Sequence, residues 1–515
     1  MISSMERIKP DSSSGKVYLI GAGPGDPGLL TIRGKELLSE AEVVVYDRLA
    51  SPRLLPFASP HAEHIYVGKR MGSHTVTQED INRLIVEKAL EGKCVARLKG
   101  GDPFIFGRGG EEAQILAEAG IYFEVVPGVT SGIAVPAYAG IPLTHRAHTA
   151  SVAFITGHRQ LDSKEADIDW EGLAKGVGTL VFLMGMKNLP NIAKRLIQYG
   201  RSPDTPVAVI RWGTTPLQTS ITGNLTNIAE KVKEAGLGPP SIIVVGDVVA
   251  LRDKASWFEN LPLLGKRILV TRTREQASDL VRLLERRGAH CLECPTIEVR
   301  LPKDLKPLDQ AINSLSTFDW VIFSSTNAVR FFFERLFDLD FDLRALGNIR
   351  IAVVGAGTAK AISALHLTSD IMPDNFRAEG LIDAFSQIDI SGKRILIPRA
   401  EKAREILPSR LSELGAEVTL VPAYVTLAPD LKPEILEILE QETIDVLTFT
   451  SSSTVKNFFR LLPDDLRNRI LEQAKVACIG PITARTAEDF GLKVTVQPDR
   501  FTISSLVSAI ENLFK

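Results

Sequence analysis

Three glycine-rich stretches follow short apolar runs of this chain, and their residue types suit the binding of a nucleoside. They comprise residues 21–28, 100–110 and 127–132. Glycine allows backbone N–H groups to approach a ligand closely, because it carries no side chain. Asp102 stands among the glycines of the second stretch, where its carboxylate could accept hydrogen bonds from a ribose or an amino group. We therefore expect the three stretches to line one shared pocket.

The first stretch differs in its spacing from the dinucleotide-binding fingerprint. Gly21 and Gly23 match the first two glycines of that pattern, but Asp26 stands where the third glycine is required. Pro24 and Pro27 also stiffen a turn that a phosphate-binding helix start normally keeps open. The stretch predicts a nucleoside cofactor site that is not built for a pyrophosphate. This argues against the alternative of a nicotinamide-dependent oxidoreductase.

The elements that must position these stretches alternate between strand and helix along the first half of the chain. Helical patterns at 78–90 and 111–119 lie between apolar runs of strand length. This alternation predicts an α/β fold, and a charged segment at 252–265 predicts a short linker after it. The predicted strands are 17–20, 43–46, 95–98, 123–126, 152–156, 179–184, 207–211 and 241–245.

Length and composition narrow the class of protein. A chain of 515 residues is too long to fold around one hydrophobic core, and its length predicts about three or four lobes. The formal charge of −2 produces no overall electrostatic attraction to nucleic acid or a membrane surface. No apolar run is long enough for a signal peptide or a membrane-spanning helix. Four unpatterned cysteines fit a reducing compartment. We expect a cytoplasmic enzyme that binds neither nucleic acid nor membrane.

The second half contains an internal repeat in which strands and the turns after them recur. The matching pairs are 265–272 with 392–399, 321–325 with 447–451, and 355–359 with 480–484. Two such copies predict two similar α/β lobes. The turns at the strand ends recur best, and ligands of open α/β sheets bind there. The alternative is an old duplication that was kept only for packing.

The first half resembles the uroporphyrinogen-III C-methyltransferases over residues 16–258. The resemblance rests on the three glycine-rich stretches together with Val45-Tyr46-Asp47-Arg48-Leu49, Val67-Gly68-Lys69-Arg70 and Gly140-Ile141-Pro142-Leu143-Thr144-His145-Arg146. It implies the tetrapyrrole methylase fold of two α/β lobes and S-adenosylmethionine as cofactor. The cofactor-binding residues carried over by motif are Pro24, Gly100, Gly101, Asp102, Ile105, Thr130, Ser131, Met184 and Gly213.

The same resemblance implies a proton acceptor at Asp47 and a proton donor at Lys69. For each residue an alternative stays open, namely a carboxylate that caps a turn and a solvated turn lysine. The substrate carries many carboxylates, for which Arg48 and Arg146 offer charged donors. Arg146 could equally form a surface ion pair.

The second half, residues 264–515, resembles uroporphyrinogen-III synthase. The motifs are Phe323-Ser324-Ser325-Thr326-Asn327-Ala328, Phe449-Thr450-Ser451-Ser452 and Ile479-Gly480-Pro481-Ile482-Thr483-Ala484. The resemblance implies one lobe from 266–298 plus 427–515 and another from 299–426. Tyr424 would donate a proton to the leaving hydroxyl, with a core tyrosine as the alternative. The predicted substrate contacts are Arg272, Ser325, Thr358, Ser451 and Thr483.

Together the two resemblances imply a bifunctional enzyme of tetrapyrrole synthesis. It would close hydroxymethylbilane to uroporphyrinogen III and methylate that product twice to precorrin-2, on the route to sirohaem and cobalamin. We expect a homodimer through the methyltransferase half. The alternative for the second half is a non-catalytic module that binds anions. Cys291 and Cys294 have zinc-like spacing but lack a second pair, so we expect no metal.

Overall fold

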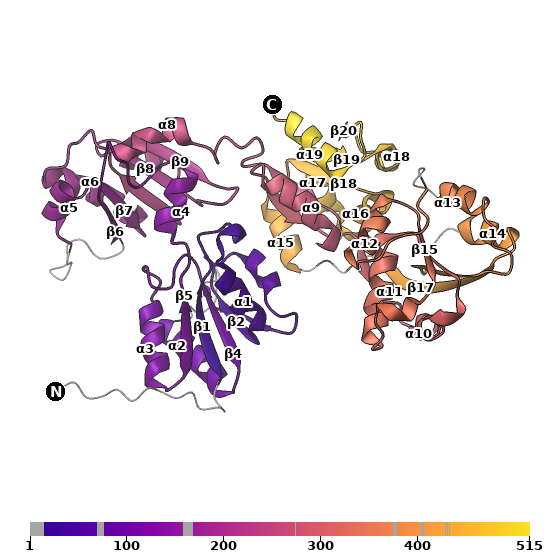
Figure 1. The fold of residues 1–515 in the computed structure, drawn as a ribbon. Helices are drawn as coiled ribbons and strands as arrows, with labels where there is room; N and C mark the ends of the chain where they lie inside the picture. The colour runs from indigo at the N-terminus through magenta and orange to yellow at the C-terminus, as the bar shows by residue number, and fades with distance from the viewer. Residues whose placement is uncertain are drawn as a thin grey trace. The chain divides into compact units, whose positions relative to one another are not determined.

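The computed structural model describes residues 15–68, 77–157, 168–272, 274–373, 378–402, 406–427, 429, 431 and 433–515. It separates into two compact units (Figure 1). The first consists of Met1–Arg267, Leu283–His290 and Glu511–Lys515, and the second of Ile268–Arg282 and Cys291–Ile510. Both units have an α/β fold with two five-stranded sheets each, and the sequence predicts this fold class. None of the described helices is long and apolar enough to cross a membrane.

The first lobe of unit one is a five-stranded parallel sheet in the order β3-β2-β4-β1-β5. Apolar clusters cover both faces, so the central strands are apolar almost throughout. Helix α2 occupies the residues that the sequence predicts, whereas the edge strand β3 was not predicted. The elements are β1 (Lys16–Gly21), α1 (Ile32–Glu40), β2 (Val43–Tyr46), β3 (Glu63–Tyr66), α2 (Gln78–Leu90), β4 (Cys94–Lys99), α3 (Gly109–Glu118) and β5 (Tyr122–Val126).

The second lobe of unit one is a mixed sheet in the order β6-β7-β10-β8-β9. Only β6 and β7 pair in parallel, and the other neighbours are antiparallel. Helix α4 packs on one face, and α5, α6 and α7 pack on the other. The elements are α4 (Ser131–Tyr138), β6 (Val152–Thr156), α5 (Trp170–Gly176), β7 (Thr179–Leu183), α6 (Leu189–Gln198), β8 (Pro206–Arg211), β9 (Thr219–Asn224), α7 (Ile228–Glu234) and β10 (Ser241–Val245).

The predicted linker is ordered against this lobe over much of its length. Helix α8 (Arg252–Ala255) is followed by Trp257 and Phe258, whose rings lie 5.0 and 4.9 Å from the ring of Tyr138. The indole N–H of Trp257 donates to the carbonyl of Ala137 at 3.1 Å. Aromatic contacts therefore hold this stretch against α4, and charge and proline content alone did not reveal that.

Unit two contains two sheets of similar design, ordered β12-β11-β18-β19-β20 and β13-β17-β16-β14-β15. Each five-stranded sheet joins two strands from one copy of the repeat to three strands from the other, at the parallel pairs β11·β18 and β14·β16. The strands are β11 (Arg267–Val270), β12 (His290–Glu293), β13 (Glu298–Arg300), β14 (Trp320–Phe323), β15 (Arg350–Val353), β16 (Arg394–Ala400), β17 (Glu417–Leu427), β18 (Val446–Phe449), β19 (Lys475–Cys478) and β20 (Val494–Val496).

The helices of unit two cover both sheets. The run of three phenylalanines at 331–333 is buried, and Phe332 and Phe333 belong to the core between α11 and the second sheet. The helices are α9 (Arg274–Glu285), α10 (Lys306–Asn313), α11 (Thr326–Asp338), α12 (Ala356–Ala364), α13 (Ala378–Phe385), α14 (Ile406–Glu413), α15 (Pro433–Gln441), α16 (Ser452–Leu461), α17 (Asp464–Gln473), α18 (Pro481–Asp489) and α19 (Ile503–Asn512).

The repeat is visible in the backbone as well as in the sequence. Ser325 and Ser451 are N-caps of α11 and α16, with φ/ψ of −156°/158° and −160°/160°. Gly355 and Gly480 precede α12 and α18, with φ/ψ of −166°/171° and −170°/175°. The recurring turns are therefore helix starts of the same geometry.

Buried threonines join the two chain segments at the β11·β18 pair. The hydroxyl of Thr271 donates to the carbonyl of Thr448 at 2.7 Å, and the hydroxyl of Thr448 donates to the carbonyl of Leu269 at 3.0 Å. Both threonines are 1% exposed. These bonds satisfy hydroxyls that would be costly to bury alone, and they tie the beginning of unit two to its last third.

Candidate active site

The three glycine-rich stretches meet at the carboxyl ends of β1, β4 and β5. Gly23 and Gly101 form a two-bond bridge, with N···O distances of 3.2 and 2.7 Å. A Cβ on Gly21 would lie 2.4 Å from the Cα of Gly128, and a Cβ on Gly128 would lie 2.3 Å from the carbonyl oxygen of Gly101. These distances leave no room for a side chain, so the approach of the backbones requires glycine.

Asp102 ties two of the stretches together. One carboxylate oxygen accepts the backbone N–H groups of Phe104 and Ile105, at 2.8 and 3.1 Å. The other oxygen accepts the N–H of Gly128 at 2.9 Å. A carboxylate has about four acceptor positions, so about one stays open for a ligand. The residue therefore builds the loop in addition to any contact that it makes with a cofactor.

The remaining predicted cofactor residues surround this point. Thr130 is the N-cap of α4 and Ser131 is the first residue of that helix, so the helix N-terminus faces the glycine stretches, with the N–H nitrogen of Ser131 at 3.7 Å from a Cβ built on Gly101. The side chains of Ile105 and Met184 are 41% and 50% exposed. Gly100 packs its backbone against Leu49.

Backbone strain is concentrated at these loops. Met184 and Trp212, which follow β7 and β8, have φ of 57° and 49°, and Phe106 and Thr214 have φ of 54° and 67°. A positive φ is costly for residues with large side chains and persists mainly where function or packing imposes it. Among the described residues, these strained positions follow strands in both lobes of unit one.

Asp26, the residue that breaks the dinucleotide spacing, joins the two lobes of unit one. Its carboxylate accepts the hydroxyl of Tyr138 at 2.7 Å, and its N–H donates to the hydroxyl of Thr214 at 3.2 Å. Burial and the bond to Asp26 raise the pKa of Tyr138, because both disfavour the phenolate. Gly213 is packed in the same place, since a Cβ there would lie 2.3 Å from Val135. Pro24 lies in the turn just before this contact.

Asp47 follows β2 and lies above a buried cluster of charges that sequence reasoning missed. Its carboxylate accepts the guanidinium of Arg97 at 3.1 Å and the N–H of Leu49 at 3.0 Å. Arg97 also contacts Glu112, which accepts Lys99 at 2.7 Å. The signal in the sequence was two cations, Arg97 and Lys99, at a spacing of two in an otherwise apolar strand. Such a spacing places both on one face of the strand, where burial requires a counter-charge.

The other predicted methyltransferase residues are less closely gathered. The guanidinium of Arg48 lies 5.8 Å from the ring centroid of Trp212, so it reaches from the first lobe to the second. Arg146 is exposed in the turn between His145 and Thr149. Lys69 lies outside the described residues.

In unit two, Ser325 and Tyr424 lie in contact. The other predicted substrate contacts differ in how exposed they are to solvent. The hydroxyl of Ser325 lies 3.1 Å from that of Tyr424. Ser451 caps α16 at the corresponding place in the other lobe. Thr358 and Thr483 are only 6% and 5% exposed, so they mainly support the first turns of α12 and α18. Arg272 is partly buried directly after β11, and that burial lowers its pKa.

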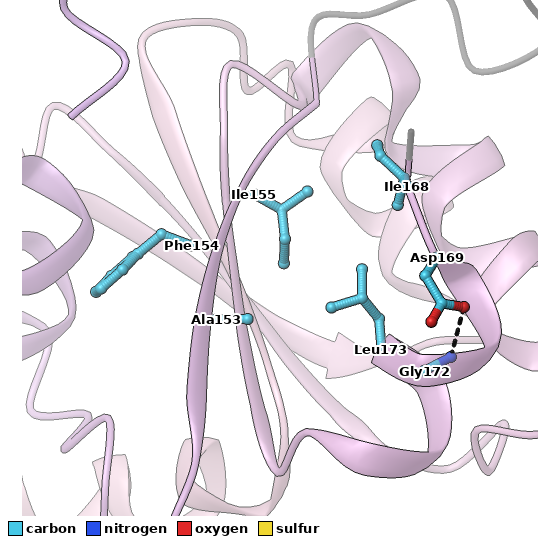
Figure 2. Close-up of a pocket in the computed structure, with 7 residues that line it drawn as sticks. All are labelled: Ala153, Phe154, Ile155, Ile168, Asp169, Gly172 and Leu173. Carbon is cyan, nitrogen blue, oxygen red and sulfur yellow. Dashed lines mark hydrogen bonds between the residues drawn. The ribbon is translucent and has the colours of Figure 1, made fainter. Parts of the chain in front are cut away.

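A separate hollow of about 310 Å³ lies on the second lobe of unit one (Figure 2). Figure 2 shows Asp169 turned back to accept the N–H of Gly172, at 2.9 Å, beside the apolar side chains of Ile155 and Leu173. None of the site residues predicted from the sequence lines this hollow. In the part of the chain that the structure describes, no group of three or more acidic, histidine or cysteine side chains is placed to hold a metal.

Comparison with known proteins identifies both halves. Residues 16–229 match the family of tetrapyrrole (corrin/porphyrin) methylases, and residues 278–508 match uroporphyrinogen-III synthase HemD. The chain is also 40% identical to the porphyrin biosynthesis protein HemD of Ruminiclostridium josui, over 96% of its own length and 97% of that protein. The chain belongs to this HemD family. Unit one therefore carries the methylase and unit two carries most of the synthase, and both predicted resemblances are confirmed.

Two further comparisons concern the methylase alone. Over 239 residues, 46% of this HemD-family chain and 94% of the relative, it is 56% identical to the S-adenosyl-L-methionine-dependent uroporphyrinogen III methyltransferase of Methanosarcina barkeri. A solved structure of uroporphyrin-III C-methyl transferase from Thermus thermophilus, complexed with S-adenyl homocysteine, is 42% identical. It covers 46% of this chain and 100% of its own, with a TM-score of 0.40.

Proposed function

We propose that this HemD-family chain catalyses two steps of tetrapyrrole synthesis. The synthase closes hydroxymethylbilane to uroporphyrinogen III, and the methylase transfers two methyl groups to that product to give precorrin-2. The observation that carries the proposal is the match of 96% of the chain to a porphyrin biosynthesis protein, together with the methylase and synthase family matches along this chain. The converging glycine loops of the methylase supply an independent structural reason for a nucleoside cofactor.

The cofactor of the methylase is S-adenosylmethionine, which supplies a methyl group already activated by its sulfonium charge. The Methanosarcina relative is named for its dependence on this compound. The close backbone contacts at Gly21, Gly101 and Gly128 fit a nucleoside, because they form a turn without side chains. We assign its binding to Pro24, Gly100, Gly101, Asp102, Ile105, Thr130, Ser131, Met184 and Gly213.

The protein's own task in methyl transfer is to hold the two partners and to move protons. We assign proton acceptance to the carboxylate of Asp47, which is about one-quarter exposed and fixed from behind by Arg97. Lys69 is the proposed proton donor. Arg48 and Arg146 are proposed to bind carboxylates of the macrocycle, for which a planar guanidinium is well suited.

In the synthase we assign proton donation to the hydroxyl of Tyr424, which would protonate the hydroxyl that leaves hydroxymethylbilane as water. Arg272 and the helix starts at Ser325, Ser451, Thr358 and Thr483 would hold the carboxylates of the folded chain. The exposed hydroxyls and N–H groups at these starts can bind carboxylates without a fixed positive charge. For the buried Thr358 and Thr483, this proposal rests on the helix start and not on the side chain.

We also propose a homodimer that assembles through the methylase and acts in the cytoplasm on small tetrapyrroles. The few unpatterned cysteines support the cytoplasmic location, and the near-neutral charge fits a small-molecule substrate in place of a polyanionic partner. Light scattering of the full chain at micromolar concentration tests the assembly, and a monomer would contradict it.

The deciding experiment incubates the purified chain with hydroxymethylbilane, with and without S-adenosylmethionine, and measures product masses and isomers. We expect type III uroporphyrinogen without the cofactor, and a product heavier by two methyl groups with it. Closure only to the spontaneous type I isomer would favour the alternative, in which unit two binds anions without catalysis. Methylation of added uroporphyrinogen III would test the methylase separately.

A further inference from the structure

The charged cluster beneath Asp47 is almost completely buried. Glu112 is 0% exposed, and the side chains of Arg97 and Lys99 are 3% and 5% exposed. One oxygen of Glu112 accepts Arg97 at 3.3 Å, Lys99 at 2.7 Å and Gln78 at 3.1 Å. Burying charged side chains is unfavourable unless their partners are well placed. The presence of this buried cluster therefore requires an explanation.

Arg97 connects this cluster to Asp47 through separate nitrogens of one guanidinium. Its Nε donates to Glu112, one terminal nitrogen donates to the carboxylate of Asp47 at 3.1 Å, and the other donates to the carbonyls of Val45 and Leu98 at 3.4 and 3.1 Å. Every nitrogen is engaged, so the planar group has one orientation. A lysine could not reproduce this arrangement, because its ammonium has no fixed fork of donors.

With both basic side chains charged, the formal charges of the cluster balance when the carboxylate of Asp47 is included. Arg97 and Lys99 contribute two positive charges, whereas Glu112 contributes one negative charge. Burial and the neighbouring charge of Arg97 lower the pKa of Lys99. The partly exposed carboxylate of Asp47 is therefore the fourth member of a buried ionic network, although it lies at the surface of the site.

A purely stabilising role does not explain the cluster well. The second oxygen of Glu112 is buried and has no hydrogen-bond partner among the described residues, whereas structural networks usually satisfy such atoms. The network also reaches the cofactor loop, because Lys99 directly precedes Gly100. It thus links the two places where the reaction needs fixed geometry.

We propose that Arg97 is a positioning residue that holds the carboxylate of Asp47 in place for proton acceptance, with Glu112 as the anchor of Arg97. This inference rests on the proposed role of Asp47. In this arrangement a residue of the buried strand β4 orients the side chain of Asp47, which lies at the end of the neighbouring strand β2.

The test is a double-mutant cycle on the full-length protein, with methylation of uroporphyrinogen III as the assay. We expect Arg97→Lys to lower kcat by about 10- to 100-fold while the KM for uroporphyrinogen and the Kd for S-adenosylmethionine change less than about twofold. In the Asp47→Asn background, Arg97→Lys should cause no further loss, because the residue it acts through is gone. Arg83→Lys, on the exposed face of α2, is the matched control and should keep the parental kcat.

Two outcomes overturn the inference. One is an equal loss of kcat in both backgrounds, which would indicate a general structural role. The other is a parental kcat in Arg97→Lys. A parental kcat in Asp47→Asn would instead reject the proposed role of Asp47, so the two failures are distinguishable. If Arg97→Lys does not fold, Glu112→Gln replaces it in the same cycle with the same expectations, since it removes only the anchoring charge.

Discussion

The hydroxyl of Ser325 lies 3.1 Å from the hydroxyl of Tyr424, and this contact joins the first turn of α11 to strand β17. The ring of Tyr424 stacks on Phe331, at a centroid distance of 6.0 Å and an angle of 19°. The guanidinium of Arg330 lies 4.2 Å from the ring centroid of Phe331. The ring is therefore fixed by stacking, while its hydroxyl shares a helix N-terminus with the capping serine.

Tyr424→Phe should lower the share of type III isomer formed from hydroxymethylbilane. The ring contacts remain and only the hydroxyl is lost, so the stability should change by no more than about 1 kcal/mol. The isomer ratio is the measurement, because spontaneous closure gives type I. Tyr122→Phe, exposed on the methylase, is the control. A parental ratio would leave Tyr424 as a packing residue.

Gly128→Ala should abolish cofactor binding, because its Cβ would meet the backbone of Gly101 and Gly21 at 2.3 and 2.7 Å. Neither neighbour is the end of a flexible side chain, so the loops must separate. Gly110→Ala is the matched control, since nothing lies within 4 Å of its Cβ on α3. Calorimetry with S-adenosylmethionine measures both variants. Parental affinity in Gly128→Ala would show that the meeting of the loops does not form the site.

Asp102→Ala should weaken S-adenosylmethionine binding and also lower the melting temperature. The variant loses the acceptor of three backbone N–H groups, and a hydrogen bond to a charged group contributes about 1.5–3 kcal/mol. Calorimetry and thermal unfolding measure the two effects. Unchanged affinity in a folded variant would remove Asp102 from the cofactor site.

The double variant Thr271→Val and Thr448→Val should destabilise the synthase by about 1–3 kcal/mol, because two buried hydrogen bonds across β11 and β18 are lost while the shapes are kept. Urea unfolding of the full chain, followed by the signal of the synthase, is the measurement. Thr495→Val on the exposed side of β20 should change stability by less than about 0.5 kcal/mol. An equal loss of stability in the double variant and in Thr495→Val would contradict the stabilising role of the β11·β18 pair.

Alkaline pH should reduce stability through Cys294. Burial raises the pKa of this thiol from 9.0 to about 12, so the folded state keeps a proton that the unfolded state loses above pH 9. The thiol's contribution is complete below pH 9 and falls by about 1.4 kcal/mol per pH unit as pH rises toward 12. Cys294→Ala should therefore show a shallower loss of unfolding free energy above pH 9 than the parent. Identical slopes in the parent and Cys294→Ala would contradict the expectation.

The strands and glycine loops of the methylase could be predicted because their signals are local. Short apolar runs predicted β1, β2, β4 and β5, and glycine-rich stretches at the ends of β1, β4 and β5 marked where those strands stop. Strand β9 was missed because Thr219–Asn224 contains polar residues and a glycine and pairs at an edge of the sheet. Edge strands bury little and carry a weak apolar pattern.

The charged cluster could not be predicted because its members meet only after folding. Arg97 and Glu112 are fifteen residues apart on a strand and a helix, and Asp47 comes from another strand. Composition shows that charges exist but not which of them are buried. From the sequence, Asp26 was interpreted only as the residue that stands in place of the third glycine. In the structure its carboxylate connects the two lobes of unit one.

The exchange of strands between the two halves of the repeat has a consequence for synthesis on the ribosome. Thr271 and Thr448 are 177 residues apart in the chain, yet they bond to each other in neighbouring strands. At ordinary translation rates β11 must wait about 10 to 35 s for its partner to emerge. During that time an apolar strand of the nascent chain is open to wrong pairing and to chaperones. A stop codon between β11 and β18 would leave β11 without this partner, although the methylase ahead of it would already have been synthesised.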